Sequence, residues 1–315
     1  MKLPFEVPDR GLRAFDVVGL GLNSIDLVSV VDTFPAPNSK QRLREFTRMP
    51  GGQIATAMCV CSRLGWAASY IGTFGDDDLG ALSRQSLVDA RVDVHASRTV
   101  PGATNQFAVV LVDRSNGDRT VLWDRHPGLT MNPSDLRRVD VVGGRLLVVD
   151  CHETAAAARA AEYARQAGIP TIVDVESVRP GIHDLLRHID AIIAAQGFPE
   201  ALTGHADPGR ALEEMAAAFA APLVCVTLGA DGSLARCGGR EIRTPGLKVE
   251  CVDTTGAGDA FRGGFAAACL HAPEGDVEEA LAYANAVAGL NCCRLGARGG
   301  LPTREEVERV VYAKF

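Results

Sequence analysis

The chain lacks three features that would narrow its class at once: a Cys-x-x-Cys pair, a long uninterrupted apolar run and a cluster of basic residues. Its nine cysteines are odd in number and lie scattered in apolar surroundings. Two pairs are close in sequence, Cys59/Cys61 and Cys292/Cys293, but neither has the spacing of a zinc knuckle. We therefore expect reduced, mostly buried thiols that pack as small hydrophobic side chains.

The same absences argue against membrane and nucleic-acid partners. The one long small-residue stretch, 155–164, is interrupted by Arg159 and Glu162, so no membrane span is expected. Pro4 and Pro8 break the first residues, which lack the apolar core of a signal peptide. A net charge of −7, without basic residues interleaved with aromatic ones, excludes a basic nucleic-acid-binding face. These patterns predict a cytoplasmic protein.

No internal repeat, low-complexity tract or flexible linker interrupts the 315 residues, of which 47% are hydrophobic. A chain of this size forms one large α/β domain, with or without a small appendage. Buried strands are predicted at Phe15–Leu22, Ala68–Ile71, Arg145–Asp150, Pro170–Val175, Ala191–Ala194 and Leu223–Leu228. Helices are predicted at Ile54–Leu64, Leu79–Ala90, Thr154–Ala167, Pro208–Ala220, Ala260–Leu270 and Val277–Cys293. This alternation predicts a mainly parallel sheet that is covered by helices on both faces.

Two stretches, 27–50 and 98–126, break this rhythm with alternating patterns that are typical of exposed strands. In the second stretch, the segments 107–112 and 119–123 flank the sequence Ser115-Asn116-Gly117-Asp118, which predicts a hairpin turn. We expect these strands to form a small sheet that projects from the main domain. The whole chain, 1–315, is then a single domain with an inserted projection.

The most informative segment, residues 253–259, reads Asp-Thr-Thr-Gly-Ala-Gly-Asp and leads into an apolar helical run from Ala260. The unpaired N–H groups and the positive dipole end of such a helix attract anions, above all phosphates. The small residues Gly256, Ala257 and Gly258 allow a phosphate to approach the backbone. A carboxylate has the wrong sign for holding phosphate, so Asp259 is better suited to remove a proton from an attacking hydroxyl. The alternative is an acidic residue that only complements the helix dipole.

This segment resembles the C-terminal signature of the ribokinase (PfkB-type) family of sugar and nucleoside kinases, and other family landmarks follow in order over nearly the whole chain. The resemblance implies that Asp259 is the catalytic base and that the amides of Gly256, Ala257 and Gly258 form an anion hole for the transferring phosphoryl group. It also implies a ribokinase-like three-layer α/β/α domain, whose projecting sheet is a lid over the sugar and an interface for a homodimer. ATP and Mg²⁺ are the implied cofactors.

Asn23 and Asp26, which follow the first strand, are candidates for sugar binding. The preceding Gly19-x-Gly21 is not a dinucleotide fingerprint, because β-branched residues rather than a helix follow Ser24. Asn23 and Asp26 lie just past the strand's end, where α/β sheets place ligands. The resemblance implies that Asp26 hydrogen-bonds two sugar hydroxyls, and an ordinary turn aspartate is the alternative.

A glycine pair before a helix resembles the family's N-terminal signature. Gly51 and Gly52 allow close approach of the backbone to substrate, and Gln53 follows them. Thr56 stands where the family commonly has Asn, and a hydroxyl donates one hydrogen bond where an amide donates two. With Thr in place of Asn, the chain looks more like the members that act on ketoses, such as the ketohexokinase-like and sulfofructose-kinase-like branch. Asn105 is a further substrate candidate.

Residues 226–232 resemble the family's second nucleotide element, a strand that ends in a glycine turn. The resemblance implies that Thr227, Gly229 and Gly232 approach the ATP phosphates, and Asn285 is a candidate for nucleotide contact. Two phosphate-compatible turns at one edge of the sheet indicate a nucleotide site far more specifically than either turn does alone.

A potassium site and a magnesium site are further implications of the resemblance. The candidates for a monovalent cation, bound mostly through backbone carbonyls, are Asp253, Thr255, Asn291, Arg294 and Gly296. Gly300 has no side-chain oxygen where some members carry one. The family's Asn-x-x-Glu element, which supports Mg²⁺, is missing, and only Gln196 and Glu200 partly compensate. We therefore expect Mg²⁺ to arrive with ATP, held mainly by phosphates and water.

Other acidic residues have structural alternatives. Asp76, Asp77 and Asp78 match the family's Gly-Asp-Asp-x-x-Gly element, but acidic residues that open a helix simply cap it, and neighbouring side chains diverge too much to favour a metal site. Several residues at strand ends are expected to face one crevice: Asp150, His152, Asp174, Glu176 and Arg179. His152 either contacts sugar or is an ordinary loop histidine.

The sequence thus predicts an ATP-dependent kinase that phosphorylates a primary alcohol of a small sugar, of pentose or ketohexose type. A nucleoside kinase is the alternative on the same fold and would need a clamp for the base, for which Phe107 and Trp123 are available in the lid. A catalytically silent pseudokinase would be expected to lose Asp259, which is present.

Overall fold

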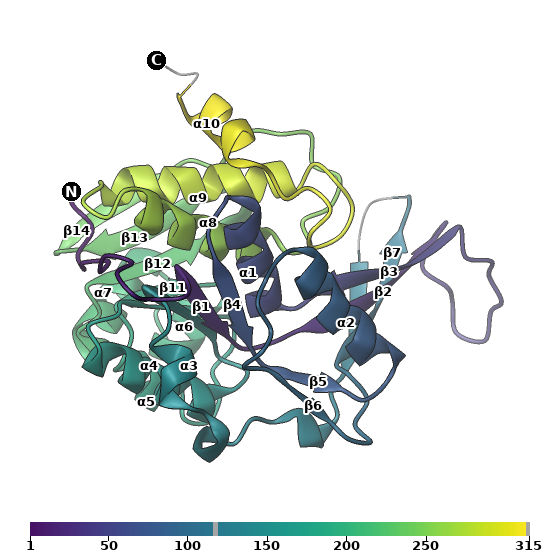
Figure 1. The fold of residues 1–315 in the computed structure, drawn as a ribbon. Helices are drawn as coiled ribbons and strands as arrows, with labels where there is room; N and C mark the ends of the chain where they lie inside the picture. Colours follow the sequence, from purple (N-terminus) through teal and green to yellow (C-terminus); the bar gives the residue numbers. More distant parts are fainter. Residues whose placement is uncertain (116–118, 313–315) are drawn as a thin grey trace.

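An eight-stranded sheet forms the centre of the computed structural model, which describes residues 1–115 and 119–312 (Figure 1). The strand order is β14-β13-β12-β11-β10-β9-β1-β4. Six strands pair in parallel: β1 (Val17–Leu20), β4 (Ala68–Ile71), β9 (Leu146–Asp150), β10 (Thr171–Val175), β11 (Ala191–Ala194) and β12 (Leu223–Thr227). The last two strands, β13 (Ser233–Cys237) and β14 (Arg240–Thr244), extend the sheet as an antiparallel hairpin.

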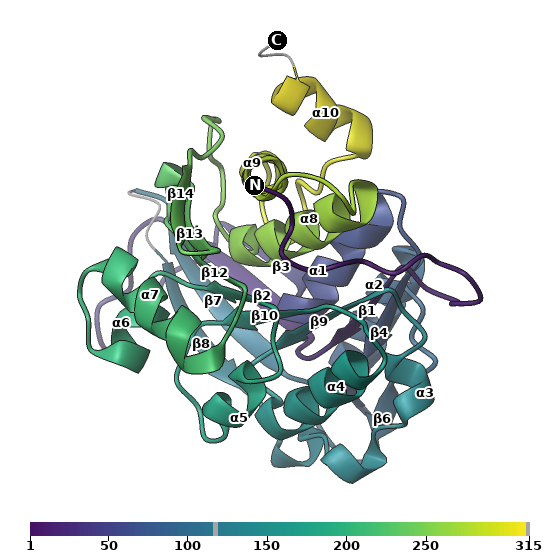
Figure 2. The same ribbon diagram turned by 90° about the vertical axis from the view of Figure 1, so that its left-hand side faces the viewer.

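Helices cover both faces of this sheet, because alternate strand residues point into two separate hydrophobic cores. In β9, Leu146 and Val148 belong to one core, and Leu147 and Val149 belong to the other. The first core is closed by α1 (Gln53–Arg63), α2 (Asp78–Asp89), α8 (Ala257–His271), α9 (Val277–Asn291) and α10 (Arg304–Tyr312). The second core is closed by α3 (Arg138–Val141), α4 (Thr154–Gln166), α5 (Ile182–Leu186), α6 (Phe198–Thr203) and α7 (Pro208–Phe219). Figure 2 shows these two helical layers on opposite sides of the sheet.

A second sheet of four strands projects from one end of the molecule (Figure 1). Its order is β3 (Glu45–Gly51), β2 (Ser24–Val31), β7 (Phe107–Asp113) and β8 (Arg119–Asp124). These strands come from the two stretches that break the α/β rhythm. The central residues of the expected hairpin turn, 116–118, lie outside the described residues.

Part of the second stretch lies elsewhere. Strand β6 (Arg98–Val100) pairs with β5 (Thr73–Gly75) in a separate two-stranded sheet. Short 3₁₀ turns at Pro127–Leu129 and Pro133–Asp135 then lead back to the main domain. Only residues 107–124 of this stretch therefore contribute strands to the projecting sheet.

The three-layer fold with a mainly parallel sheet is confirmed. The six predicted strands and six predicted helices form, and most of their ends lie within one or two residues of the expected positions. The hairpin β13–β14 was not predicted, because charged residues such as Arg236 and Arg243 interrupt the continuous apolar run that marked the other strands of this sheet. None of the helices among the described residues is long and apolar enough to cross a bilayer.

Parallel strands end at the same edge of a sheet, and this edge faces the projecting sheet. Here Asp150 is the last residue of β9, and its Oδ2 accepts a hydrogen bond of 2.6 Å from the backbone N–H of Leu22. A side chain at Gly21 would collide with the same carboxylate, so only glycine fits between β1 and β9. The carboxyl ends of β1 and β9 are thereby held in close contact.

Candidate active site

The loop before α8 forms a turn that only glycine can make. Gly256 has a φ of 74° and stands at the N-cap of α8. A Cβ at this position would lie 2.5 Å from the carbonyl oxygen of Ala297. The turn directs the first N–H groups of α8 away from the helix body, at the positive end of the helix dipole.

Three of these N–H groups have no acceptor among the residues that the structure describes: those of Gly256, Gly258 and Asp259. The N–H of Ala257, in contrast, donates to the carbonyl of Thr254 at 3.2 Å. The candidate anion hole therefore includes the N–H of Asp259, which the sequence did not suggest, in place of that of Ala257.

Asp259 lies in the first turn of α8 and is half-buried. Burial raises the pKa of its carboxyl group to about 6; nearby Arg262 holds the pKa down, while Glu176 raises it further. A carboxylate with this pKa is ionised at neutral pH and is still basic enough to accept a proton from a reacting hydroxyl.

Arg262, one helical turn after Asp259, is a site residue that sequence reasoning missed. Its guanidinium group is almost fully buried, forms a 2.9 Å ion pair with Asp174 and donates to the carbonyl of Ile193 at 3.2 Å. A Cβ at Gly258 would collide with this guanidinium, so the small residue lets the arginine lie directly under the loop. The only available signal was the i, i+3 spacing from Asp259, which places both residues on one face of the helix.

Asp26, on strand β2, lies near enough to Asp259 for the two carboxyl groups to interact electrostatically. Burial raises the pKa of its carboxyl group to about 6, partly offset by a 3.4 Å hydrogen bond from Ser24 Oγ. Its Oδ2 lies 2.8 Å from where a Cβ of Gly51 would be, so the glycine leaves room for this carboxylate. The charge of Asp26 also contributes to the raised pKa of Asp259, which places both groups in one electrostatic environment.

Two predicted substrate ligands form hydrogen bonds within the protein. Asn23 donates to Tyr70 Oη at 3.0 Å and to the carbonyl of Thr73, and its oxygen accepts from Ser83 Oγ. Asn105 accepts from the N–H of Gly75 at 3.0 Å, and its amide nitrogen donates to a neighbouring carbonyl. These contacts give both side chains a role in fixing the loops around the cleft.

The glycine pair and the residues after it have free polar groups. Gly52 has a φ of 88°, and a Cβ there would overlap the backbone of Asn23. The Oε1 atom of Gln53 is buried without a hydrogen-bond partner among the described residues. Thr56 is fully buried, and its hydroxyl accepts a 3.1 Å hydrogen bond from Arg298 Nε. Because a hydroxyl can donate while it accepts, Thr56 still has one proton for a ligand.

Asp253 organises the candidate cation site. One carboxylate oxygen accepts from the N–H and the hydroxyl of Thr255, at 2.8 and 2.7 Å, and the other accepts from the N–H of Gly296 at 2.8 Å. Asn291 donates to the carbonyl of Ala297 at 2.9 Å, and its own Oδ1 is buried without a partner among the described residues. An orphaned oxygen beside this loop fits a monovalent cation, for which Asp253 and Arg294 would contribute only backbone carbonyls.

The projecting sheet contacts this loop through Arg119, a second residue that the sequence did not suggest. Its Nη1 atom donates to the hydroxyls of Thr254 and Thr255, at 2.9 and 3.2 Å, and lies 3.5 Å from Asp253 Oδ1. Strand β8 therefore places a positive charge at the entrance of the candidate anion hole.

The second phosphate-compatible turn lies at the end of β12. Thr227 Oγ1 donates to the carbonyl of Ala194 at 3.3 Å, and the N–H of Leu228 donates to the carbonyl of Gly232 at 2.8 Å. Gly232 has a φ of 92°, and any side chain there would overlap the backbone at Thr244. A Cβ at Gly229, in the same turn, would have no atom within 4 Å, so the turn borders open space.

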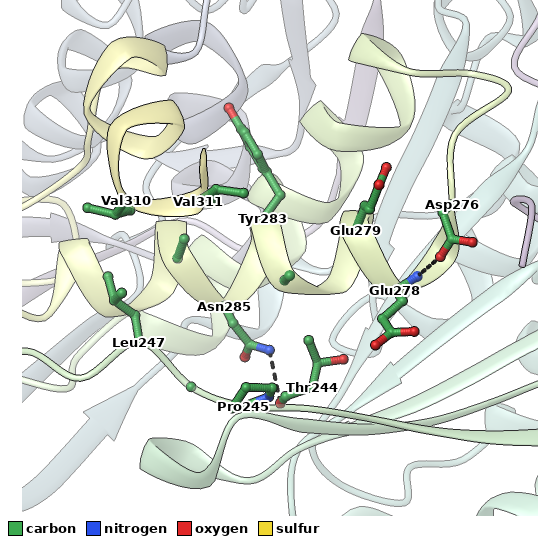
Figure 3. A pocket seen from close by; sticks show the side chains of 13 residues that line it. Thr244, Pro245, Leu247, Asp276, Glu278, Glu279, Tyr283, Asn285, Val310 and Val311 are labelled. Carbon is green, nitrogen blue, oxygen red and sulfur yellow. Dashed lines mark hydrogen bonds between the residues drawn. The ribbon is translucent and has the colours of Figure 1, made fainter. Parts of the chain in front are cut away.

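A cavity of about 470 Å³ adjoins this turn (Figure 3). Its walls are residues 244–247, the first part of α9 and the end of α10. Asn285 lines it and donates to Ser233 Oγ at 3.1 Å and to the carbonyl of Thr244 at 3.4 Å, as the dashed line in Figure 3 marks for Thr244. Asp276, Glu278 and Glu279 lie at the far end; Asp276 pairs with the N-terminal ammonium group of Met1, and the negative charge of the two glutamates would repel phosphates. The cavity therefore suits an uncharged heterocycle.

The remaining acidic residues are structural or lie apart. Asp77 caps α2 by accepting from the N–H of Gly80 at 2.9 Å, as helix capping predicts. His152 and Glu176 pair at 3.2 Å, at the ends of β9 and β10. Gln196 and Glu200 lie on the surface near the start of α6. Within the described residues, no group of three or more His, Cys, Asp or Glu side chains could hold a metal ion.

Comparison with known proteins identifies the family to which the chain belongs. A model of the pfkB family carbohydrate kinases matches residues 14–304. The chain is 30% identical to ribokinase from Bacillus subtilis (93% of this chain, 98% of the relative) and 32% identical to an ATP-dependent ribose-1-phosphate kinase from Halopiger xanaduensis (95% and 99%). The structure of Arabidopsis thaliana ribokinase complexed with ribose and ATP superposes with a TM-score of 0.83, at 24% identity, over 95% of this chain and 99% of that one. The chain belongs to the pfkB family of carbohydrate kinases.

Proposed function

We propose that this protein transfers the γ-phosphoryl group of ATP to a primary hydroxyl of a small sugar, with Asp259 as the general base. As a member of the family, it is a phosphotransferase with an alcohol group as acceptor. The observation that carries the residue assignment is the position of Asp259, half-buried beside three N–H groups that have no acceptor among the described residues, and within electrostatic reach of Asp26.

In this proposal Asp259 accepts the proton of the attacking hydroxyl while the sugar oxygen bonds to the γ-phosphorus and the bond to the leaving oxygen of ADP breaks. The N–H groups of Gly256, Gly258 and Asp259 stabilise the charge on the transferring group. Arg119 adds a positive charge from the lid side. Bound Mg²⁺ would neutralise phosphate charge, but we assign it no protein ligand, because Gln196 and Glu200 lie on the surface.

On the sugar side, Asp26 accepts hydrogen bonds from substrate hydroxyls, while Gln53 and Thr56 supply one free oxygen and one free proton. The names of the two curated relatives suggest ribose derivatives as first candidates. Thr56 in place of Asn suggests a ketose instead. Both classes therefore belong in the first experiment.

On the nucleotide side, the turn from Thr227 to Gly232 approaches the ATP phosphates, and the cavity beside Asn285 receives the base. The acidic end of this cavity orients ATP, because it repels the phosphates toward the α8 loop. The orphaned Oδ1 of Asn291 supports potassium binding behind that loop.

We further propose a homodimer through the lid. Strands β3 and β8 expose Phe46, Val121, Leu122 and Trp123, which are between 48% and 63% accessible. The register places Val121 and Trp123 on one face of the sheet and Leu122 and Phe46 on the other, so apolar side chains are exposed along both outer strands, as is typical of edges that pair with another chain.

The substrate experiment is a panel of pentoses, ribose 1-phosphate, ketohexoses and nucleosides with ATP·Mg²⁺, read as ADP formed. A pentose, ribose 1-phosphate or a ketohexose is expected to give a kcat/KM at least tenfold above that of any nucleoside. A nucleoside as best substrate would replace the proposed sugar by the alternative acceptor. No ADP with any sugar would contradict the proposal.

The raised pKa values of Asp259 and Asp26, both about 6, predict an acidic limb in the pH profile. Asp259 must be deprotonated to accept a proton, so kcat/KM is expected to be constant above about pH 7 and to fall at least tenfold per pH unit well below pH 6. Direct chromatographic measurement of ADP from pH 4.5 to 8 checks this. A rate unchanged between pH 7 and pH 5 would contradict the role of Asp259.

A further inference from the structure

Three cysteines lie near the α8 loop: Cys251 precedes the loop, and Cys292 and Cys293 follow the last turn of α9. The structure describes all nine cysteines of the chain, and Cys251 is the only exposed one. Cys292, the C-cap of α9, is buried, and Cys293 is half-buried. Cys251 is therefore the exception to the expected burial of the thiols, and its sulfur is open to a solute.

The segments that carry Cys251 and Cys292 are held together by backbone hydrogen bonds. The carbonyl of Cys292 accepts from the N–H of Val252 at 2.8 Å and from the N–H of Asp253 at 3.2 Å. The two side chains also interact directly: burial, and then the charge of Cys251 and a hydrogen bond with its side chain, raise the pKa of the Cys292 thiol to about 12. An exposed thiol thus lies beside a buried one, on two segments that the backbone already joins.

Cys293 is a poorer partner for either thiol. Its Sγ donates to the carbonyl of Gly289 at 3.7 Å, within the last turn of α9. A bond between Cys292 and Cys293 would join adjacent residues, whose Cα atoms are only about 3.8 Å apart, whereas a disulfide usually spans about 4.4–6.8 Å. The local geometry therefore favours Cys251 with Cys292.

We propose that Cys251 and Cys292 form a thiol–disulfide exchange site, which reacts with a low-molecular-weight disulfide such as oxidised glutathione, and that the bond between them lowers kinase activity. The thiolate of Cys251 attacks one sulfur of the oxidant, and the first glutathione thiolate leaves. The thiol of Cys292 then gives its proton to solvent, and its sulfur attacks Cys251 Sγ and releases the second glutathione. Two protein thiols are oxidised, and one small disulfide is reduced to two thiols.

The order of the two steps follows from the difference in exposure. The oxidant reaches Cys251, because Cys292 is only 8% accessible. Once Cys251 is part of a mixed disulfide, it carries no negative charge, so one cause of the raised pKa of Cys292 disappears. The buried thiol can then act as the resolving group.

The bond would act on the α8 loop through Asp253. The N–H of this residue donates to the carbonyl of Cys292, and its carboxylate holds Thr255 and Gly296. A covalent bond between two sulfurs is shorter than their contact, so its formation draws Cys251 toward α9 and shifts the start of the loop. A displacement of about 1 Å in a reacting group can cost about 10²-fold in rate. This coupling rests on the proposed kinase function, whereas formation of the disulfide does not.

The experiment incubates the full chain with oxidised glutathione, blocks the remaining thiols with iodoacetamide and identifies linked peptides by mass spectrometry without reduction. We expect a link between Cys251 and Cys292 that dithiothreitol removes. Cys292→Ala cannot resolve the first step, so Cys251 should keep one glutathione in that variant. Cys251→Ser should form no such link, and the matched control Cys293→Ser should form it as the native chain does.

Three results would overturn the exchange site: no loss of thiols in the native chain, glutathione that stays on Cys251 of the native chain, or a link between two chains instead of one within a chain. Because the link is detected by mass, this test does not depend on turnover.

The coupling is measured as kcat for ADP formation with the best acceptor, before and after oxidation. The native chain is expected to lose activity at least about fivefold and to recover it with dithiothreitol, whereas Cys251→Ser should keep its activity under the same treatment. An unchanged kcat in the linked chain would overturn the effect on activity, and an equal loss in Cys251→Ser would assign that effect to another thiol.

Discussion

Asp259→Asn is expected to lower kcat by about 10²- to 10⁴-fold, the usual contribution of a positioned general base. The amide keeps the shape of the carboxylate but cannot accept the proton of the sugar hydroxyl. Binding of ATP should persist, because the N–H groups of the loop are unchanged. The measurement is kcat with the best sugar, alongside the Kd of ATP by calorimetry. A variant that keeps more than a tenth of native kcat would contradict the assignment.

The stability of this variant separates lost chemistry from lost folding. Asp259 has a raised pKa in the folded state, so the folded chain holds this proton more tightly than the unfolded chain. The associated stability is present at low pH and is lost as pH rises through about 6, which means that the ionised carboxylate destabilises the fold at pH 7. Asp259→Asn is therefore expected to have a Tm at pH 7 no lower than that of the native chain. Asp26→Asn is the matched control: it should mainly raise the KM of the sugar.

Arg262→Leu is expected to lower the free energy of unfolding by about 3–5 kcal/mol at pH 7.5, because it leaves the carboxylate of Asp174 buried without its partner. Both side chains of this ion pair are only 3% accessible. Burial raises the pKa of Asp174 to about 7, and loss of the arginine should raise it further. Urea unfolding followed by circular dichroism gives the measurement.

Two comparisons test the cause of this loss. At pH 5, below the native pKa of about 7, Asp174 is neutral in both the native chain and the variant, so the destabilisation by Arg262→Leu should shrink. The double variant Arg262→Leu/Asp174→Leu removes both charges and should recover much of the stability that the single variant loses. A loss below about 1 kcal/mol at pH 7.5, or no recovery in the double variant, would show that the pair does not act as a unit.

The fold could be predicted from the sequence, because buried parallel strands and amphipathic helices carry their own periodicity. The α8 loop could also be predicted, since seven consecutive residues encode it. The three arginines around it could not. Arg298 and Arg119 act on residues more than a hundred positions away, and no local pattern marks such a contact. Arg262 lies on the predicted helix, but its burial depends on Asp174 from a distant strand.

The hydrogen bonds of two predicted substrate ligands, Asn23 and Asn105, could not be predicted for a similar reason. Asn23 and Asn105 lie at the expected edge of the sheet, where an amide suits a sugar. Their partners, Tyr70, Ser83 and Gly75, come from elsewhere in the chain and use the same donors and acceptors. Position relative to a strand end can be predicted from sequence, whereas the hydrogen bonds that remain free for a ligand depend on the assembled fold.

Strand β8 combines two features with a practical consequence. At one end of the strand, Arg119 contacts Thr254 and Thr255 of the α8 loop. In its middle, Val121, Leu122 and Trp123 are exposed. A second copy of the chain that covers those apolar side chains would also restrain the arginine. Specific activity would then rise with protein concentration, so that dilute assays would underestimate the turnover of each subunit.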